Sequence, residues 1–202
     1  MELSFCKNHM TGKVCVVTGA TAGIGKVTAT ALASHGAEVI IAGRNHQKAE
    51  ATLQQIKNET GNESLQYLLA DFSDLDQVRN LAAAFKERYT RLDILVNNAG
   101  SFFNTRRETP YGVEKTFLVN HLAPFLLTTL LLEILQGSPP ARIVNVSSDG
   151  HKLATMDLDD LGFKRGFSGM KAYGRSKLAN IMFTYELARR LAGSNVTANA
   201  LH

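Results

Sequence analysis

Short runs of consecutive apolar residues alternate with longer amphipathic stretches along the whole 202-residue chain. The apolar runs are rich in β-branched residues and predict strands at residues 14–18, 38–42, 65–70, 92–96, 142–146 and 196–201. The stretches between them predict helices over residues 27–34, 45–58, 108–135 and 171–191, and one from a cap at Ser73 or Asp74 to Tyr89.

Continuous apolar strands separated by helices of this length are typical of βαβ units. The pattern therefore predicts an α/β fold with a doubly wound parallel sheet of the Rossmann type. We expect one domain over residues 1–202, in which residues 1–11 form an N-terminal extension.

Polar motifs follow directly after three of the predicted strands. They are the glycine loop at residues 18–25, the Asn-Asn-Ala-Gly stretch at residues 97–100, and the pair Ser147 and Ser148. In doubly wound sheets, ligands bind beyond the carboxyl ends of the strands. The three motifs are therefore expected to meet at one edge of the sheet and to form the functional site there.

The glycine loop joins the first predicted strand to the first predicted helix. Gly19 permits a tight turn, Gly23 lets the backbone approach a pyrophosphate, and Gly25 allows close helix packing. The free N–H groups of the helix N-terminus would then face the phosphates. The spacing G-x-x-x-G-x-G differs from the dinucleotide fingerprint G-x-G-x-x-G, and Val27 after Lys26 excludes a P-loop. Three glycines at this place favour nucleotide binding over a plain turn.

The end of the second predicted strand bears on the choice between NAD and NADP. An acidic residue there would bind the ribose 2′-hydroxyl of NAD, whereas an arginine favours the 2′-phosphate of NADP. The chain has Arg44 at this place and no acidic residue before Glu50. The alternative is an ordinary surface arginine at a helix start. Because a guanidinium can hold a phosphate through two hydrogen bonds, NADP(H) is predicted and NAD is less favoured.

Tyr173 and Lys177 are four residues apart in a predicted helix and share one face of it. A neighbouring cation lowers the pKa of a phenol from about 10, which would let Tyr173 exchange a proton with an alcohol or a carbonyl. Such pairs also occur by chance on helix surfaces. His121 and His151 are rival acid/base groups, for which solvated or structural roles are expected.

Charge and cysteine content exclude several other functions. The net charge of +4 comes from scattered residues, without the basic stripe and interleaved aromatic residues of a nucleic-acid surface. Cys6 and Cys15 have no metal-ligand spacing, so no metal site is predicted. A disulfide framework is not expected, which indicates a reducing compartment. Cys15 should be a small buried apolar residue.

The most apolar stretch, residues 118–135, contains several polar residues and Pro124. It is expected to be a buried core helix rather than a membrane span. Residues 1–11 show no apolar run of a signal peptide. A soluble cytoplasmic protein is expected; peripheral membrane association or another reducing compartment is left open.

The order of these motifs resembles the short-chain dehydrogenase/reductase family along nearly the whole chain. The matching elements are residues 18–25, Asp71, residues 97–100, residues 145–148 and Tyr173-x-x-x-Lys177. Residues 116–122, 142–148 and 176–180, and the long segment between Ser148 and Tyr173, are similar to the retinol-dehydrogenase-like branch of the family.

The resemblance implies four catalytic residues. Tyr173 would be the general acid/base, and Lys177 would lower its pKa and bind the nicotinamide ribose. Ser148, rather than Ser147, would hold the substrate oxygen, and Asn120 would hold a water that connects Lys177 to solvent.

The resemblance also extends the cofactor site. Asp71 would contact the adenine amino group, while Asn98 and Gly100 would line the cofactor ribose. The expected cofactor-binding residues are Gly19, Thr21, Gly23, Ile24, Gly25, Arg44, Asp71, Asn98, Ala99, Gly100, Tyr173 and Lys177. The implied activity is NADP(H)-dependent transfer of a hydride between the nicotinamide and a lipophilic carbonyl or alcohol, such as a retinoid, steroid or aldehyde.

Members of the family usually continue beyond the place corresponding to His202, with a substrate-covering part and a last strand. We therefore expect these parts to be lacking and the sixth strand to be a sheet edge. The alternative function is a truncated, weakly active or inactive NADP-binding protein that acts through binding or dimerisation. A homodimer is left open, as is the role of residues 152–170, either an apolar lip over the site or a plain surface loop.

Overall fold

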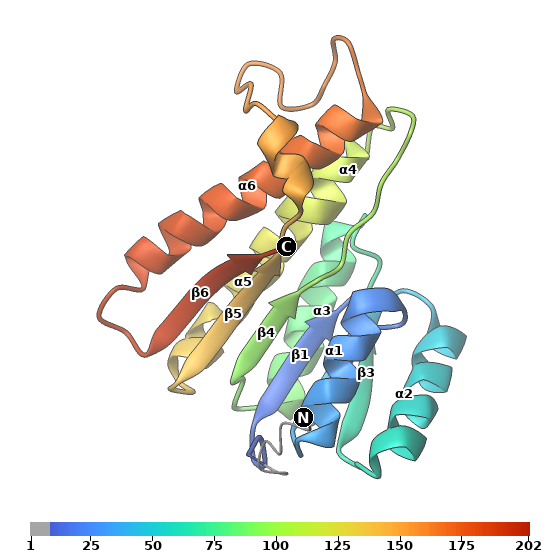
Figure 1. Cartoon of the computed structure of the whole chain (residues 1–202), viewed down its shortest axis with the longest axis vertical. Helices are drawn as coiled ribbons and strands as arrows, with labels where there is room; N and C mark the ends of the chain where they lie inside the picture. Colours follow the sequence, from blue (N-terminus) through green and yellow to red (C-terminus); the bar gives the residue numbers. More distant parts are fainter. Residues whose placement is uncertain (1–8) are drawn as a thin grey trace, which may run out of the picture.

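A computed structural model describes residues 9–202 of the chain; Cys6 and residues 1–8 of the expected extension lie outside the described residues. Six parallel strands form one sheet in the order β3-β2-β1-β4-β5-β6 (Figure 1). Their bounds are β1 (Val14–Thr18), β2 (Glu38–Gly43), β3 (Leu65–Leu69), β4 (Ile94–Asn97), β5 (Ala141–Val146) and β6 (Val196–Leu201). This is the doubly wound α/β fold that the sequence pattern predicts, and β6 lies at a sheet edge.

Helices follow each of the first five strands. They are α1 (Gly23–Ser34), α2 (His46–Thr60), α3 (Leu75–Arg88), α4 (Lys115–Phe117), α5 (Ala123–Gln136) and α6 (Gly169–Arg190). Two short segments complete the set, the π-helical turn η1 (Leu118–Leu122) and the 3₁₀ turn η2 (Asp149–Leu153).

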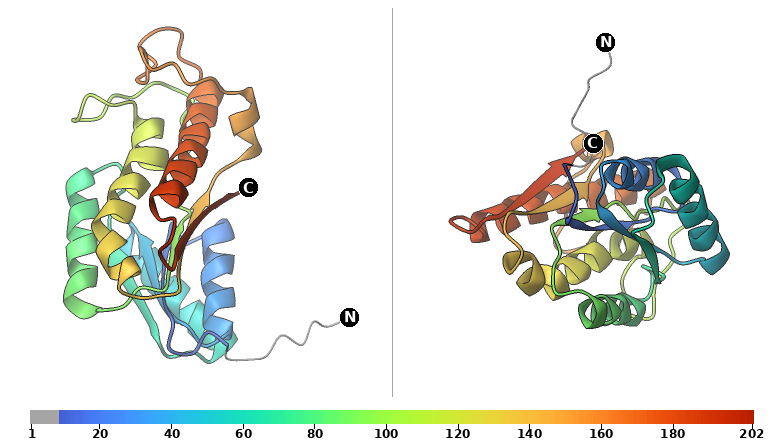
Figure 2. Two further views of the ribbon diagram at one scale, coloured as in Figure 1. Left: turned by 90° about the vertical axis from the view of Figure 1, so that its left-hand side faces the viewer. Right: turned by 90° about the horizontal axis from the view of Figure 1, so that it is seen from below.

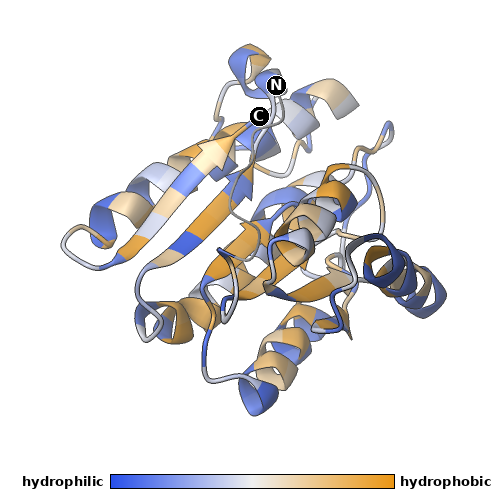
Figure 3. Cartoon of the chain, turned by 60° about the horizontal axis from the view of Figure 1, so that its bottom comes forward, coloured by the Kyte–Doolittle hydropathy of each residue, from blue (hydrophilic) through white to orange (hydrophobic). Residues whose placement is uncertain are grey.

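Two hydrophobic cores lie on opposite faces of the sheet. Helices α1 and α2 cover one face, and α3, α5 and α6 cover the other, as Figure 2 also shows. Because side chains alternate along a strand, Val14 and Val16 enter one core while Cys15 and Val17 enter the other. This double burial explains why the central strands β1, β2 and β4 read as continuous apolar runs. Figure 3 shows the resulting mixture of largely hydrophobic strands and more hydrophilic helix surfaces.

The buried thiol of Cys15 confirms the expectation of a small apolar residue. Its side chain is completely buried in the middle of β1. Burial, assisted by the nearby negative charge of Asp93, raises the pKa of this thiol to about 12. The group is therefore neutral at ordinary pH and behaves as part of the core.

The predicted helix over residues 108–135 was placed too early. It begins at Lys115, because the Glu114 carboxylate accepts hydrogen bonds from the backbone N–H groups of Thr116 (2.9 Å) and Phe117 (3.0 Å). An acidic cap at this position satisfies the free donors of a helix start. Residues 108–114 instead form a turn that is closed by a bridge between Glu108 and Glu114.

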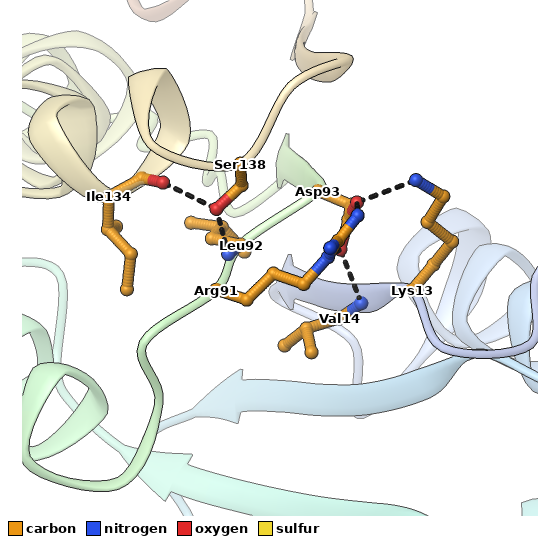
Figure 4. A network of polar contacts seen from close by, with 7 residues as sticks. All are labelled: Lys13, Val14, Arg91, Leu92, Asp93, Ile134 and Ser138. Carbon is orange, nitrogen blue, oxygen red and sulfur yellow. Dashed lines mark hydrogen bonds and ion pairs between the residues drawn. The ribbon is translucent and has the colours of Figure 1, made fainter.

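The first helix and the fourth strand also begin at other places than predicted. Helix α1 begins at Gly23 and not at residue 27, so two glycines of the loop belong to its first turn. Strand β4 begins at Ile94 and not at residue 92. Leu92 is not in the strand because its backbone N–H donates to the Ser138 hydroxyl (3.0 Å, Figure 4).

Asp93 joins β1 and β4 at the end of the sheet where these strands begin, opposite their carboxyl ends. Figure 4 shows its contacts. Its carboxylate accepts hydrogen bonds from the Lys13 ammonium (2.8 Å), both guanidinium arms of Arg91 (2.7 Å each) and the Val14 N–H (3.0 Å). Burial by itself would raise the pKa of Asp93, but these hydrogen bonds outweigh it and hold the pKa below its usual value. The group is therefore a charged clamp between two strands.

The helical stretch Lys115–Gln136, which comprises α4, η1 and α5, is long and apolar enough to cross a membrane by length and composition. Half of its most apolar part is buried inside the fold. Leu118, Leu127 and Leu131 lie in the core beneath the sheet. In this fold the helix therefore has the place of a core helix, as the sequence predicted.

The strand order reverses direction between β1 and β4, which lie side by side although three helices and two strands separate them in sequence. In sheets of this topology the crevice beyond the carboxyl ends of these two strands is the usual ligand-binding place. The glycine loop follows β1 and the Asn-Asn-Ala-Gly stretch follows β4, so both meet at this crevice.

Candidate active site

Thr18 and Asn98 hold the ends of β1 and β4 together at the crevice. The Thr18 hydroxyl accepts hydrogen bonds from the backbone N–H groups of Asn98 (3.0 Å) and Ala99 (2.9 Å). The Asn98 side-chain amide donates to the carbonyls of Thr18 (2.9 Å) and Gly19 (3.2 Å). The role of Asn98 and Ala99 visible in the structure is thus to brace the glycine loop. Sequence reasoning did not find Thr18, because its partners lie about eighty residues away.

Close packing explains two of the three glycines. A Cβ atom at Gly19 would lie 2.8 Å from the Ala99 Cα, and one at Gly25 would lie 2.4 Å from the Asn98 side-chain nitrogen. Gly23 differs, since it has open space around it and a φ of 55°, a left-handed conformation that favours glycine. The backbone at Gly23 is therefore free for the approach of another molecule.

The N-terminus of α1 lacks a side-chain cap. Ala22 occupies the cap position, and no side chain accepts a hydrogen bond from the first-turn N–H groups. Ile24, in this first turn, is 67% exposed. Such a helix start has free donors and the positive end of the helix dipole, which suits an anionic group. Thr21 lies beside it and contacts Gly43 at the end of β2.

One cleft of about 590 Å³ brings three of the four predicted catalytic residues, Ser148, Tyr173 and Lys177, together with Ile24 of the glycine loop, whereas Asn120 does not line it. Its lining residues are Ile24, Asn98, Gly100, Ser101, Phe102, Val146, Ser147, Ser148, Asp149, Tyr173, Lys177, Leu201 and His202. Ser148, Tyr173 and Lys177 come from the end of β5 and from α6, so the fold unites groups that the sequence separates. Residues 152–170 do not contribute to this lining.

The two serines after β5 have different surroundings. The Ser147 hydroxyl is buried and donates to the Lys177 carbonyl (3.0 Å), which gives it a structural role. Ser148 is half-buried, and its hydroxyl accepts from the Gly150 N–H (3.2 Å). A Cβ atom at Gly150 would lie 3.6 Å from the Ser148 hydroxyl and 3.5 Å from the Tyr173 ring. The serine hydroxyl and the tyrosine ring thus flank the same glycine.

Lys177 lies on α6 one turn after Tyr173, as its spacing predicts. Its ammonium donates to the Val146 carbonyl (2.8 Å) and lies 5.6 Å from the centre of the Tyr173 ring. Burial lowers the pKa of Lys177 to about 8, because the charged form loses hydration. This lysine therefore titrates closer to neutral pH than a surface lysine.

Asn120 lies in the π-helical turn η1, a feature that the regular helix prediction did not contain. Such turns are frequent at functional sites. Its side chain accepts from the Ser101 N–H (2.7 Å) and donates to the Ser101 carbonyl (2.9 Å) and the Ser176 hydroxyl (3.0 Å). The Asn120 carbonyl accepts from the Asn180 side chain (2.9 Å). Asn120 thus connects the loop after β4 with α6.

Ser176 and Asn180 are structural partners that the sequence reasoning missed. Asn180 follows Lys177 by three positions, so it continues the helix face that carries Tyr173 and Lys177. Helical spacing could have indicated Asn180, whereas the bond from Asn120 to Ser176 depends on packing between helices.

Arg44 and Asp71 lie outside the cleft. Arg44 is exposed immediately after β2. The Asp71 carboxylate follows β3 and accepts hydrogen bonds from the backbone N–H and the hydroxyl of Ser73 (2.8 Å each). Both residues follow the carboxyl ends of their strands, as the glycine loop does, so they lie at the same end of the sheet. Their predicted cofactor contacts stay predictions.

Neither of the two rival histidines contacts a catalytic side chain through the hydrogen bond that its ring makes. His121 is held against the Asn180 side-chain oxygen (3.0 Å), and burial lowers its pKa below the usual value. The His151 ring donates to the Ser148 carbonyl (2.7 Å). Neither ring lines the cleft. Phe102, which the sequence analysis did not single out, does line it, and its ring lies edge-on to Tyr173 at 5.8 Å.

The comparisons with known proteins agree with this arrangement. A profile of the family described as short chain dehydrogenase matches residues 13–202. Human retinol dehydrogenase 13 is 46% identical over 97% of this chain and 60% of its own length. Human polyprenol dehydrogenase is 44% identical over 94% of this chain and 59% of its own length. The chain thus spans about three fifths of the length of the curated relatives that it matches.

Solved structures show the same fold. A crystal structure of an uncharacterised protein from Mycobacterium paratuberculosis superposes with a TM-score of 0.83 at 38% identity, covering 95% of this chain and 68% of that one. A short chain dehydrogenase from Escherichia coli CFT073, solved in complex with NADPH, gives a TM-score of 0.79 at 28% identity over 96% of this chain and 77% of its own. By sequence and by fold, the chain belongs to the short-chain dehydrogenase/reductase family, in its retinol-dehydrogenase-like branch.

Proposed function

We propose that this protein is an NADP(H)-dependent oxidoreductase that transfers a hydride between the nicotinamide and a lipophilic carbonyl or alcohol. The observation that carries the proposal is the single cleft in which Ser148, Tyr173 and Lys177 meet Asn98 and Gly100 at the strand ends. A nucleotide-binding protein without chemistry would need none of the three side chains.

The residues around this crevice fit a nicotinamide dinucleotide. The uncapped start of α1 suits a pyrophosphate, and the open backbone at Gly23 permits its approach. A Cβ atom at Gly100 would lie 3.4 Å from the Asn120 side-chain oxygen and 3.5 Å from the Lys177 ammonium, so the glycine leaves room beside both groups. Residues of the glycine loop would hold the phosphates, and Asn98, Gly100 and Lys177 would hold the nicotinamide end.

Tyr173, Ser148 and Lys177 have separate tasks in the proposed reaction. The bound cofactor supplies or accepts the hydride. The Tyr173 phenol donates a proton to the substrate oxygen during reduction and removes it during oxidation. The Ser148 hydroxyl donates a hydrogen bond to the same oxygen as negative charge develops on it. Lys177 binds the ribose and places a positive charge near the phenol.

We propose that Asn120, which does not line the cleft itself, assists Lys177 in the transfer of protons. Both polar groups of its side chain already bind protein atoms, at Ser101 and Ser176. Its water-binding role, which the family resemblance implies, therefore needs a water that shares these groups. We propose it as a link between Lys177 and solvent.

The proposed substrate is lipophilic for two reasons. Phe102, Val146 and Leu201 contribute apolar side chains to the cleft. Two of the relatives, retinol dehydrogenase and polyprenol dehydrogenase, are named after long apolar alcohols. A retinoid, a steroid or a long-chain aldehyde fits this description.

The direct test measures NADPH oxidation by the purified protein with retinal, a ketosteroid, long-chain aldehydes and short polar aldehydes. Turnover with the apolar carbonyls, and less with the polar ones, is expected. Binding of NADPH without turnover of any carbonyl would favour the alternative, an inactive NADP-binding protein. Absence of binding to both NADPH and NADH would contradict the proposal itself.

Replacement of Arg44 by alanine tests the cofactor preference. A hydrogen bond to a charged group contributes about 1.5–3 kcal/mol, so the affinity for NADPH is expected to fall by roughly tenfold or more. The affinity for NADH should not change, because NADH lacks the 2′-phosphate. Fluorescence titration measures both. Arg79→Ala, an exposed arginine paired with Asp76 on α3, is the control; an unchanged preference in Arg44→Ala would make Arg44 an ordinary surface residue.

The lowered pKa of Lys177 predicts a pH dependence of cofactor binding. The ammonium form, which would bind the ribose, predominates below the pKa of about 8 and is lost as the pH rises through it. The affinity for NADPH is therefore expected to decrease above about pH 8, at a lower pH than for an ordinary lysine. The decrease should persist in Tyr173→Phe and disappear in Lys177→Met. A decrease that disappears in Tyr173→Phe instead would assign the titration to the phenol.

A homodimer is proposed on the exposed apolar side chains of α5 and α6. Phe125, Met182 and Tyr185 are 43%, 50% and 75% exposed on these neighbouring helices. Sedimentation equilibrium tests this; a monomer at micromolar concentration would contradict it. The cytoplasmic location stays a proposal as well; it is based on the free thiol of Cys15 and can be tested by cell fractionation.

A further inference from the structure

Arg175 is a buried charged residue that the proposed mechanism does not use. It lies on α6 between Tyr173 and Lys177 and is only 6% exposed. Residues two positions apart do not share a helix face, so Arg175 points away from the cleft that Tyr173 and Lys177 line. A buried guanidinium is costly unless hydrogen bonds and charges compensate it.

The hydrogen bonds and the ring contact of the Arg175 guanidinium are made with the segment between η2 and α6, which rises above the sheet in Figure 1. The guanidinium donates to the carbonyls of Thr155 (3.2 Å) and Asp160, and it lies 3.6 Å from the centre of the Phe163 ring. Burial lowers the pKa of Arg175 below its usual value, and the nearby negative charges of Asp157 and Asp160 oppose this effect. One side chain therefore fastens three points of this segment to α6.

The segment itself has one defined turn at this place. The Asp160 carboxylate accepts from the backbone N–H groups of Lys164 (2.8 Å) and Arg165 (3.1 Å). Phe163 has a φ of 47°, a left-handed conformation that is unusual for an aromatic residue, and its side chain is 6% exposed under the guanidinium. Arg106, from the loop after β4, donates to the Gly162 carbonyl (3.0 Å). This is a docked turn and not a loose surface loop.

The fastened segment is joined through η2 to the proposed catalytic serine. Ser148 is the cap residue of η2, and Thr155 follows two residues after the end of that turn. Close packing places η2 against α6, since a Cβ atom at Gly174 would lie 2.6 Å from the Gly150 carbonyl and 3.1 Å from the Ala154 Cβ. The separation of Ser148 and Tyr173 therefore depends on how η2 is held on α6.

We propose that Arg175 is a positioning residue for the reaction, which holds η2 on α6 and so keeps the Ser148 hydroxyl and the Tyr173 phenol at their working separation. The inference rests on the proposed function of these two groups. It requires arginine in particular, because a planar guanidinium can donate to two carbonyls while its face lies on a ring, whereas a lysine ammonium cannot do both.

The test compares Arg175→Lys, which keeps the charge, with Arg175→Ala. The value of kcat/KM for the apolar carbonyl at saturating NADPH is expected to fall by roughly 10–100-fold in both, since a small misplacement of catalytic groups has effects of this size. The affinity for NADPH should remain within about twofold, because the nucleotide half of the crevice has no contact with Arg175.

Trypsin cleavage after Lys164 and Arg165 gives a second readout that needs no activity. Cleavage of the native protein is expected to be faster in Arg175→Lys, because the turn is released from α6. Arg165→Ala removes one of these cleavage sites and is therefore the matched control for the activity measurement only: its side chain is 78% exposed on the same turn, and its kcat/KM should equal that of the unmodified protein.

Two results would overturn the positioning role. One is an unchanged kcat/KM in Arg175→Lys; the other is a loss of NADPH affinity as large as the loss of kcat/KM, which would show a general structural defect. An unmodified protein that binds NADPH but reduces no carbonyl would instead contradict the proposed function, so the two failures are distinguishable.

Discussion

Replacement of Tyr173 by phenylalanine is expected to lower the rate of carbonyl reduction by about 10²–10⁴-fold, the usual contribution of a positioned acid or base. The affinity for NADPH should change little. Phenylalanine keeps the ring, which lies edge-on to Phe102 and beside Gly150, and removes only the hydroxyl that donates the proton. The packing of the cleft should therefore persist while the chemical step fails.

Single-turnover measurement of NADPH oxidation with the best apolar carbonyl would show this effect, together with fluorescence titration of the cofactor. Tyr185→Phe is the matched control, because Tyr185 lies on the same helix with 75% of its side chain exposed. Equal rates for Tyr173→Phe and the unmodified protein would refute the assignment of Tyr173. Equal losses in both variants would point to a general effect on α6.

Replacement of Asp93 by alanine is expected to lower the free energy of unfolding by about 2–4 kcal/mol at neutral pH. The variant loses the hydrogen bonds from Lys13, Arg91 and the Val14 N–H, and this N–H is buried at the start of β1. The clamp lies at the starts of β1 and β4, whereas the cleft lies beyond the carboxyl ends of the strands, so NADPH affinity at low temperature should be preserved.

Urea unfolding of the two proteins at several pH values measures the effect. The lowered pKa of Asp93 means that its stabilisation is complete above the unfolded pKa of about 3.9 and is lost as the pH falls through the folded value. The difference between Asp93→Ala and the unmodified protein should therefore shrink in acid.

Asp76→Ala is the control for this clamp, because Asp76 is 78% exposed in its ion pair with Arg79. Exposed pairs contribute less than about 1 kcal/mol. If Asp93→Ala destabilised the protein no more than Asp76→Ala does, the clamp would contribute no more than a surface pair.

Local sequence patterns were sufficient where the physical cause is local. The apolar runs located all six strands, and the reason is plainest for β1 and β2, because strands buried on both faces need apolar side chains at nearly every position. The spacing of Tyr173 and Lys177 placed them on one helix face, because residues four positions apart in a helix are neighbours on its surface. The ends of elements were less predictable: Glu114 starts its helix through its own carboxylate, and η1 interrupts a stretch that reads as one regular helix.

By itself, the sequence determined the fold class, the family and the set of catalytic candidates, because these depend on periodicity and on motifs within short windows. Only the tertiary structure decided that the Ser147 hydroxyl has a structural partner, since it donates to the Lys177 carbonyl thirty residues away. It likewise decided that Lys177 is buried, that Thr18 braces Asn98, and that Arg175 fastens the turn around Phe163. Burial, and hydrogen bonds between residues distant in the chain, exist only once the helices and the sheet are packed together.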